Sequence, residues 1–155
     1  MVKKRIVQDS EKVSEDESGI FKNVSYSNFD LEGNRYILKS AEAFNDKFSQ
    51  EVVNLKSVEA TFYFKDGTVL EIRSLIGSYN NVTLDMSFAE NVKMFYLDSS
   101  LFSDNAEYVN SDSKLIVEGN VKTQNSDGEL VADKLNFDLI DKKLKISMSH
   151  DDTVN

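Results

Sequence analysis

The sequence predicts an all-β protein, a twisted open roll built from repeated bent strands. Short apolar segments alternate with Asn, Asp, Gly and Ser from Gly19 onward, a pattern typical of strands separated by turns. Two Asp-Gly pairs, which begin at Asp66 and Asp127, supply the positive φ that hairpin turns require. A pattern of apolar, small and aromatic residues also recurs every 29 residues. Together these observations favour repeated hairpins that share one core.

The 29-residue period is visible at four positions of the repeat. They are Ile72, Leu101 and Leu130; Ser74, Ser103 and Ala132; Gly77, Ala106 and Leu135; and Tyr79, Tyr108 and Phe137. The pairs Asn91-Val92 and Asn120-Val121 keep the same interval. Such self-similarity indicates one supersecondary unit stacked several times, so that neighbouring units bury the apolar face that a single unit would leave exposed. The repeat therefore indicates a function that depends on the stacked units as a whole, rather than on a catalytic triad.

Length and composition indicate a single domain. A chain of 155 residues is long enough for one sizeable core. Residues 1–18 are charged, low in large apolar side chains and acidic between Glu11 and Glu17, and we expect them to form a disordered leader. The β domain is expected over residues 19–150, followed by a tail at 151–155.

Charge and cysteine usage exclude several kinds of site. The net charge of −9 argues against a nucleic-acid partner, because proteins that bind nucleic acid present a basic surface to its phosphates. The absence of cysteine excludes disulfides, thiolate nucleophiles and cysteine-based metal sites. No apolar run reaches the roughly 18 residues of a membrane-spanning helix. No apolar segment of signal-peptide length follows the basic residues near the start.

Strands are expected wherever apolar and polar residues alternate. The clearest is 58–64, in which Val58, Ala60, Phe62 and Phe64 share one face. After the Asp66-Gly67 turn, further strands are expected at 69–73, 83–88, 92–97, 114–119, 135–139 and 143–148, with later turns at Asp127-Gly128 and Asp141-Lys142. About nine to eleven short strands at this spacing are typical of a sandwich, a barrel or a roll.

One segment admits a second interpretation. Ala41, Phe44 and Phe48 lie at i, i+3 and i+7, which is the spacing of a helix face. The same segment is also a degenerate copy of the repeat, with Ser40 at the position of Ser74. We favour a strand, a corner and a second strand over a helix.

Each repeat contains a break in the alternation. Leu130 and Ala132 share a face, Leu135 and Phe137 share a face, and the two pairs are three residues apart. An inserted residue is what a β-bulge introduces, and a bulge bends its strand. We therefore predict bulges at 74–77, 103–106 and 132–135. Bends at one level would curve the sheet into a roll with an interior groove, and Gly77 suits a crowded corner there.

Three segments carry a resemblance to a known family. They are residues 33–43, 66–79 with its Asp-Gly turn and Ile-Arg-Ser-Leu-Ile-Gly-Ser-Tyr run, and 132–146. They resemble the LptC family, the periplasmic jellyroll of the lipopolysaccharide transport bridge, which is related to the OstA-like domains of the same pathway. The resemblance covers roughly residues 20–149 and implies a twisted open β-jellyroll, or two-sheet roll, with an apolar groove for lipid A acyl chains.

The resemblance also implies partners and a location. Its members sit in the periplasm, anchored to the inner membrane, and pair strand edges with other jellyroll proteins of the pathway and with the inner-membrane ABC transporter. They usually begin with a transmembrane helix, which the residues before Gly19 do not contain. We expect either that the anchor was removed or that the chain is a soluble relative. The function implied is that of a non-enzymatic lipopolysaccharide carrier without a cofactor.

Two sets of residues are candidates for this function. The groove candidates are Phe62, Phe64, Leu84, Met86, Phe88, Leu115, Val117, Leu144 and Ile146. Periodicity alone would place them in a closed core, and the resemblance favours a groove. The candidates for the partner-binding edge are Lys143, Lys145, Ser147 and Ser149. Lysines on an edge strand can equally protect it from pairing, whereas the functional interpretation is β-augmentation by a neighbouring jellyroll.

An enzyme is not expected. His150 is the sole histidine and follows the last predicted strand. Asp104, Asp112 and Asp127 lack the spacing of a calcium loop, and acidic residues of this kind are mostly turn formers. No metal site and no catalytic residue is therefore predicted. The competing function is a structural or adhesive β-repeat with a closed core and no lipid ligand.

Overall fold

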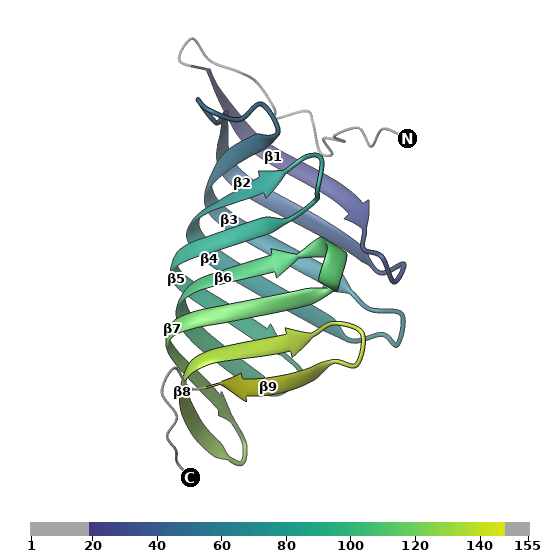
Figure 1. Ribbon diagram of the computed structural model, residues 1–155, viewed down its shortest axis with the longest axis vertical. Coiled ribbons are helices and arrows are strands. Elements are labelled where there is room, and N and C mark those ends of the chain that lie inside the picture. The colour runs from purple at the N-terminus through teal and green to yellow at the C-terminus, as the bar shows by residue number, and fades with distance from the viewer. Residues whose placement is uncertain (1–18, 148–155) are drawn as a thin grey trace.

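The computed structural model describes residues 19–147, and the side chains of residues 19–143. It contains one antiparallel sheet of nine strands in which every strand pairs with the next along the chain (Figure 1). The sheet does not close, and β1 (Ile20–Phe29) and β9 (Lys143–Ser147) are its two edges. A three-residue 3-10 turn at Asn110–Asp112 is the one helical element among the described residues. The predicted all-β class and the open roll are confirmed.

The strands are longer than the sequence suggested. Between the two edges lie β2 (Arg35–Asn45), β3 (Val52–Tyr63), β4 (Val69–Asn80), β5 (Met86–Tyr96), β6 (Ser99–Val109), β7 (Lys114–Asn125) and β8 (Gly128–Asp138). The predicted strands 83–88 and 92–97 are parts of β5. The first three residues of the former prediction are wrong, because 81–85 is a turn in which Leu84 has a φ of 68°. The predicted leader, residues 1–18, and the tail lie outside the described residues.

The segment that admitted a helix is a strand. Ala41 and Phe44 belong to β2, and Phe48 lies in the loop that follows it. The side chains of Ser40 and Ala43 are both buried although they are three residues apart. The strand interpretation of this segment is thus confirmed, and the corner that it included accounts for the spacing that resembles a helix.

Each strand from β2 to β8 bends once. In β4 and β6 the inward-facing residues jump by three, from Ser74 to Gly77 and from Ser103 to Ala106. The same jump separates Ala132 from Leu135 in β8, as the break in alternation predicted. A jump of three places two consecutive side chains outside, which turns the strand through a corner. Because the corners lie side by side, the whole sheet folds over on itself.

The fold gives two layers made from one sheet, instead of two separate sheets (Figure 1). Layer A contains the strand halves beside the turns at 30–34, 65–68, 97–98 and 126–127. Layer B contains the halves beside the loops at 46–51, 81–85, 110–113 and 139–142. The strands curve from one layer to the other along the left side of the view, and most of the turns and loops lie on the right. The apolar core fills the space between the layers.

The bulges lie in different strands from those predicted. Arg73 pairs with Lys93 and Ile76 with Ala89, so two residues of β4 face three of β5. The extra residue belongs to β5, where Glu90 and Asn91 both have positive φ. In the same way β7 carries the extra residue opposite both β6 and β8, at Gly119-Asn120. The register shifts therefore occur level with 74–77, 103–106 and 132–135, but the inserted residue is in the neighbouring strand.

Small residues at the corners have physical causes. A Cβ added to Gly77 would lie 2.5 Å from the backbone oxygen of Ser87, so the adjacent strand leaves no room for one. The Ser74 hydroxyl donates to the carbonyl of Ile76 at 2.7 Å, and the Ser103 hydroxyl donates to the carbonyl of Asn105 at 3.1 Å. Two copies of the repeat thus share a corner with the same side-chain hydrogen bond, and the third copy has Ala132 at this position.

Candidate functional site: an apolar cavity beneath a polar clasp

The predicted groove residues are buried between the layers. Phe62, Phe64, Met86, Phe88, Leu115 and Val117 all belong to the core, and Leu84 packs on it from the loop at 81–85. Phe62 is 0% exposed, and its ring contacts those of Tyr36, Phe64 and Tyr108. Leu144 and Ile146 pair through the backbone with Phe137 and Leu135; their side chains lie outside the described part. The fold thus brings most of these residues together, as packed neighbours.

One apolar cavity interrupts this packing. It has a volume of about 90 Å³ and lies between the strand halves of β4 to β7 in layer A and strands β7 and β8 in layer B. Its apolar lining is Leu70, Met94, Tyr96, Leu101, Val117 and Phe137, and its polar lining is Ser99, Ser100, Thr123 and Asn125. Tyr96 and Phe137 face one another across the layers, with ring centroids 5.4 Å apart. The site is suited to an apolar group and offers hydroxyls at its border.

Only Val117 was predicted among the lining residues. Leu101 occupies the first apolar position of the 29-residue repeat, so the repeat carried a signal for it. Tyr96 and Met94 lie in the aromatic-rich segment 92–97, and they share a face with Met86 and Phe88 because the jump of four from Phe88 to Val92 keeps the alternation in step. Simple alternation along this strand was therefore a signal for both side chains.

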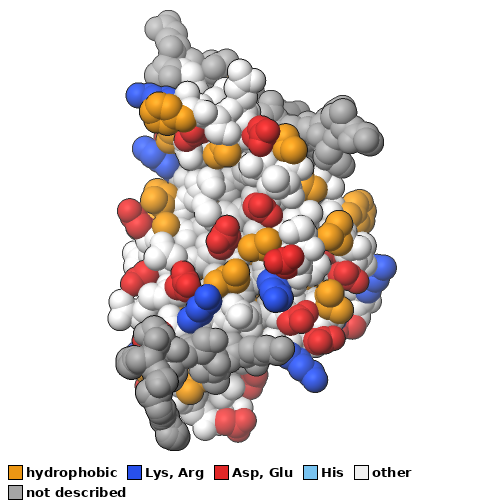
Figure 2. All heavy atoms as spheres, viewed as in Figure 1, with side chains coloured by type: hydrophobic (Ala, Val, Ile, Leu, Met, Phe, Trp, Pro, Cys, Tyr) orange, Lys and Arg blue, Asp and Glu red, His pale blue; other side chains and the backbone are white. Residues whose placement is uncertain are grey.

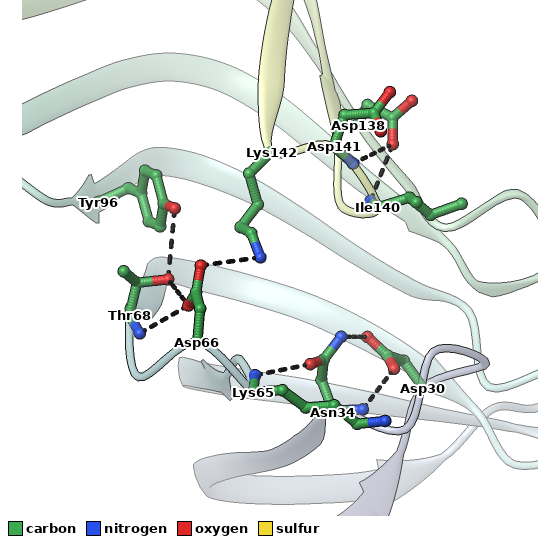
Figure 3. Close-up of polar contacts among 10 residues, drawn as sticks. All are labelled: Asp30, Asn34, Lys65, Asp66, Thr68, Tyr96, Asp138, Ile140, Asp141 and Lys142. Atoms are coloured by element: carbon green, nitrogen blue, oxygen red, sulfur yellow. Dashed lines mark hydrogen bonds and ion pairs between the residues drawn. The ribbon is translucent and has the colours of Figure 1, made fainter.

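A polar cluster closes the seam beside the cavity (Figure 3). We call Asp66, Thr68 and Lys142 the clasp. Lys142 lies in the loop between β8 and β9, and its Nζ is 3.0 Å from Asp66 Oδ2 in the turn between β3 and β4. The Thr68 hydroxyl donates to Asp66 Oδ1 at 2.6 Å and lies 3.3 Å from the Tyr96 hydroxyl. The clasp therefore connects a loop of layer B, a turn of layer A and the lining of the cavity.

Two kinds of interaction hold the clasp: the ion pair with its hydrogen bonds, and a contact between the lysine and an aromatic ring. Hydrogen bonds from the Thr68 side chain and backbone, with a further one from Lys142, lower the pKa of Asp66 to about 2, so this carboxyl is ionised at neutral pH. The Lys142 ammonium also lies 5.1 Å from the centre of the Phe64 ring. Phe64 in turn meets Tyr96 edge-on at 6.1 Å. The charged pair therefore lies beside the Phe64 ring, which packs against Tyr96 of the cavity lining.

The turn at 30–34 supports the clasp from the other side. Asp30 accepts hydrogen bonds from the backbone and side chain of Asn34 at 2.8 and 3.0 Å. Asn34 then accepts one from the backbone N–H of Lys65 at 3.0 Å, which joins two neighbouring turns of layer A (Figure 3). These bonds hold the backbone of the β3–β4 turn in place, and they thereby fix the position of Asp66.

The predicted partner-binding edge is the last strand. Lys143 begins β9 and is exposed. Lys145 and Ser147 continue the strand, with the backbone of Lys145 paired to Asn136 and that of Ser147 paired to Lys134. Ser149 and His150 lie outside the described residues. At the other end of the sheet, β2 is the one strand of the described residues that pairs with β1, so the second side of β1 is an edge within this range.

The outer surface carries mixed charges. Figure 2 shows acidic side chains spread over one face, with basic and apolar side chains between them and no basic stripe. No group of three His, Cys, Asp or Glu residues placed to hold a metal is found in the described range. Nor does any helix within that range have the length and apolar character needed to cross a membrane.

No protein-family model matches the chain, and no curated protein sequence matches it.

Proposed function

We propose that this protein is a non-enzymatic carrier that shelters the acyl chains of an amphipathic lipid, lipopolysaccharide, between the two layers of its sheet. The observation that supports the proposal is an apolar interior in a sheet that does not close, with a cavity at the seam between the layers. Each methylene moved from water to such an interior gains about 0.8 kcal/mol, so shelter alone supplies the binding energy.

The two strand edges suggest how the carrier is placed. An unpaired strand can be extended by a strand of another protein, with backbone hydrogen bonds for affinity. We propose that β1 and β9 dock the chain to neighbouring jellyroll proteins and to the inner-membrane transporter of a periplasmic lipopolysaccharide bridge. Lys143 and Lys145 lie in β9 and Lys142 lies in the loop before it, so a strand that docks on this edge would have to accommodate these charges. Directional movement of the lipid is supplied by the transporter.

Photo-crosslinking in cells tests the carrier. A p-benzoylphenylalanine residue placed at Phe62 or Tyr96 faces the interior, whereas the same residue at Tyr63 faces outward. We expect lipopolysaccharide adducts from the two interior positions and none from Tyr63. Adducts from Tyr63 alone, or from no position in a correctly folded protein, would contradict the proposal.

A second function is favoured by the tightness of the core. Phe62, Ile72 and Tyr108 are each 0% exposed, and the cavity of about 90 Å³ is smaller than the roughly 150 Å³ that holds a benzene molecule. This packing suits a structural or adhesive β-repeat with no ligand. Thermal unfolding distinguishes the two functions, because a ligand that binds only the folded state raises the unfolding midpoint. Lipopolysaccharide should raise this midpoint if the protein is a carrier. It should leave the midpoint unchanged if the protein is a structural repeat.

A further inference from the structure

One ion pair among the described residues has a position unlike the others. The pairs Lys22–Glu42, Lys122–Glu129 and Lys134–Glu118 join neighbouring strands, and Arg73–Glu71 lies within one strand. Lys142–Asp66 joins a loop of layer B to a turn of layer A, on the side where the layers are not connected by the chain (Figure 3). It therefore spans the seam through which the interior communicates with solvent.

The two ends of the interior are held by contacts of different strength. Near β2 and β4 the layers are joined by buried groups: the hydroxyls of Tyr36 and Tyr79 at 2.9 Å, and the rings of Phe62 and Tyr108 at 5.1 Å. At the cavity they are joined by the rings of Tyr96 and Phe137 at 5.4 Å and by the clasp, whose lysine and aspartate side chains are 24% and 47% exposed. An exposed ion pair contributes little net stability because water competes for both charges. The layers can therefore part at the clasp while the Tyr36 end stays closed.

We propose that Lys142 and Asp66 form a gate over the apolar cavity, and that opening this pair admits an apolar chain between the layers. The cavity is too small for an acyl chain as it stands, so a carrier of this architecture needs an opening step. Tyr96 links the two parts, since it lines the cavity and contacts both Thr68 and Phe64. The identity of the admitted chain rests on the proposed function, whereas the opening movement does not.

The absence of cysteine makes the movement measurable without any lipid. A single thiol introduced as Met94→Cys lies in the cavity, and one introduced as Val53→Cys lies in the core on β3, away from the cavity. We expect Lys142→Met to raise the rate at which a maleimide labels the thiol at position 94 by about fivefold, the effect of losing an exposed ion pair and a cation–π contact. The rate at position 53, which reports opening of the whole core, should not change.

Two further variants serve as controls. Lys142→Arg keeps the charge and the contact with the Phe64 ring, so labelling at position 94 should stay at its original rate. Glu118→Gln removes an ion pair that joins two neighbouring strands, Lys134–Glu118, whose side chains are 41% and 56% exposed, and should also leave that rate unchanged. Equal acceleration at positions 94 and 53 by Lys142→Met would show that the clasp only stabilises the fold, and no acceleration would show that it closes nothing. Either result overturns the gate, and neither bears on the lipopolysaccharide crosslinks.

Discussion

The hydroxyl groups of Tyr36 and Tyr79 lie 2.9 Å apart in the core and form a hydrogen bond between the two layers of the sheet. Tyr36 is on β2 in layer A and Tyr79 is on β4 in layer B. Burial is the main reason that the pKa of each phenol is raised above its ordinary value. Both groups therefore remain neutral over a wide pH range, and the bond that joins the layers is kept.

Removing one hydroxyl should destabilise the protein. We expect Tyr36→Phe to lower the free energy of unfolding by about 1–2 kcal/mol, because Tyr79 loses its buried partner while the ring contacts with Phe62 and Tyr108 remain. Urea denaturation followed by circular dichroism measures the change. Tyr63→Phe is the matched control, since that side chain is exposed on the outer face, and it should change stability by less than about 0.5 kcal/mol. Equal losses in the two variants would refute an interlayer role for the Tyr36 hydroxyl.

Alkaline pH should unfold the protein through its buried tyrosines. Burial raises the pKa values of Tyr36, Tyr79 and Tyr108 above their ordinary value of 10.0. Below pH 10 the phenols are protonated in both states, so their contribution to stability is fully present. As the pH rises above 10 only the unfolded chain releases these protons, and each tyrosine then lowers the free energy of unfolding by up to about 1.4 kcal/mol per pH unit.

The measurement is the slope of the unfolding free energy between pH 10 and 11. Tyr79→Phe removes one of the three phenols, so we expect a shallower slope than in the original protein. Lysines also lose their protons in this range, but they do so in both proteins and cancel in the comparison. Identical slopes would mean that the Tyr79 phenol titrates normally in the folded state.

Much of the fold was predictable because it depends on local patterns. Alternation identified most strands, the two Asp-Gly pairs identified two turns, and the jump from Ala132 to Leu135 identified a corner. The position of the bulges was not predictable from that jump. A strand that turns a corner without an insertion already shifts its inward-facing positions by three residues, as from Ser74 to Gly77, so such a shift does not mark an extra residue. The mark of insertion is instead the wider jump from Phe88 to Val92.

The candidate site was less predictable than the fold. Asp66 and Lys142 each carry the ordinary signature of a turn residue, and nothing in the sequence relates one turn to the other. Their contact depends on how far the sheet folds over, which is set by the corners of all the strands between them. The choice between a groove and a core likewise depends on the distance between layers. Side-chain periodicity is the same in both cases.

A side chain at Gly77 should disrupt the corner of β4. We expect Gly77→Ala to cost about 1–3 kcal/mol, because the new methyl group would overlap the Ser87 backbone oxygen and force β4 and β5 apart. Amide hydrogen exchange should quicken at Ser78 and its neighbours, which pair with β5 there. Gly67→Ala is the control: its Cβ would meet no atom within 4 Å, although its φ of +92° is strained for alanine. That variant should lose stability without faster exchange between β4 and β5, and a similar exchange pattern in both would contradict crowding as the cause.

Alanine substitution at the corner serines should change the free energy of unfolding in opposite directions, depending on whether the hydroxyl has a hydrogen-bond partner. Ser74→Ala and Ser103→Ala each remove a hydroxyl that donates to a corner carbonyl, so each should lower the free energy of unfolding by about 1 kcal/mol. Ser40 occupies the equivalent corner of β2, but its buried hydroxyl has no hydrogen-bond partner among the described residues. Ser40→Ala removes an unsatisfied polar group and should raise the free energy of unfolding by about 1 kcal/mol.

The double variant Ser74→Ala/Ser103→Ala tests whether the corners act independently. Strands β4 and β6 are separated by β5, so the two sites lie about 10 Å apart, and changes at that distance usually add. We therefore expect a combined loss of about 2 kcal/mol in urea denaturation, with an unchanged dependence on urea concentration. A combined loss well above the sum would mean that the corners bend as one unit. A loss from Ser40→Ala equal to that from Ser74→Ala would instead show that hydroxyl volume, and not its hydrogen bond, is what the repeat preserves.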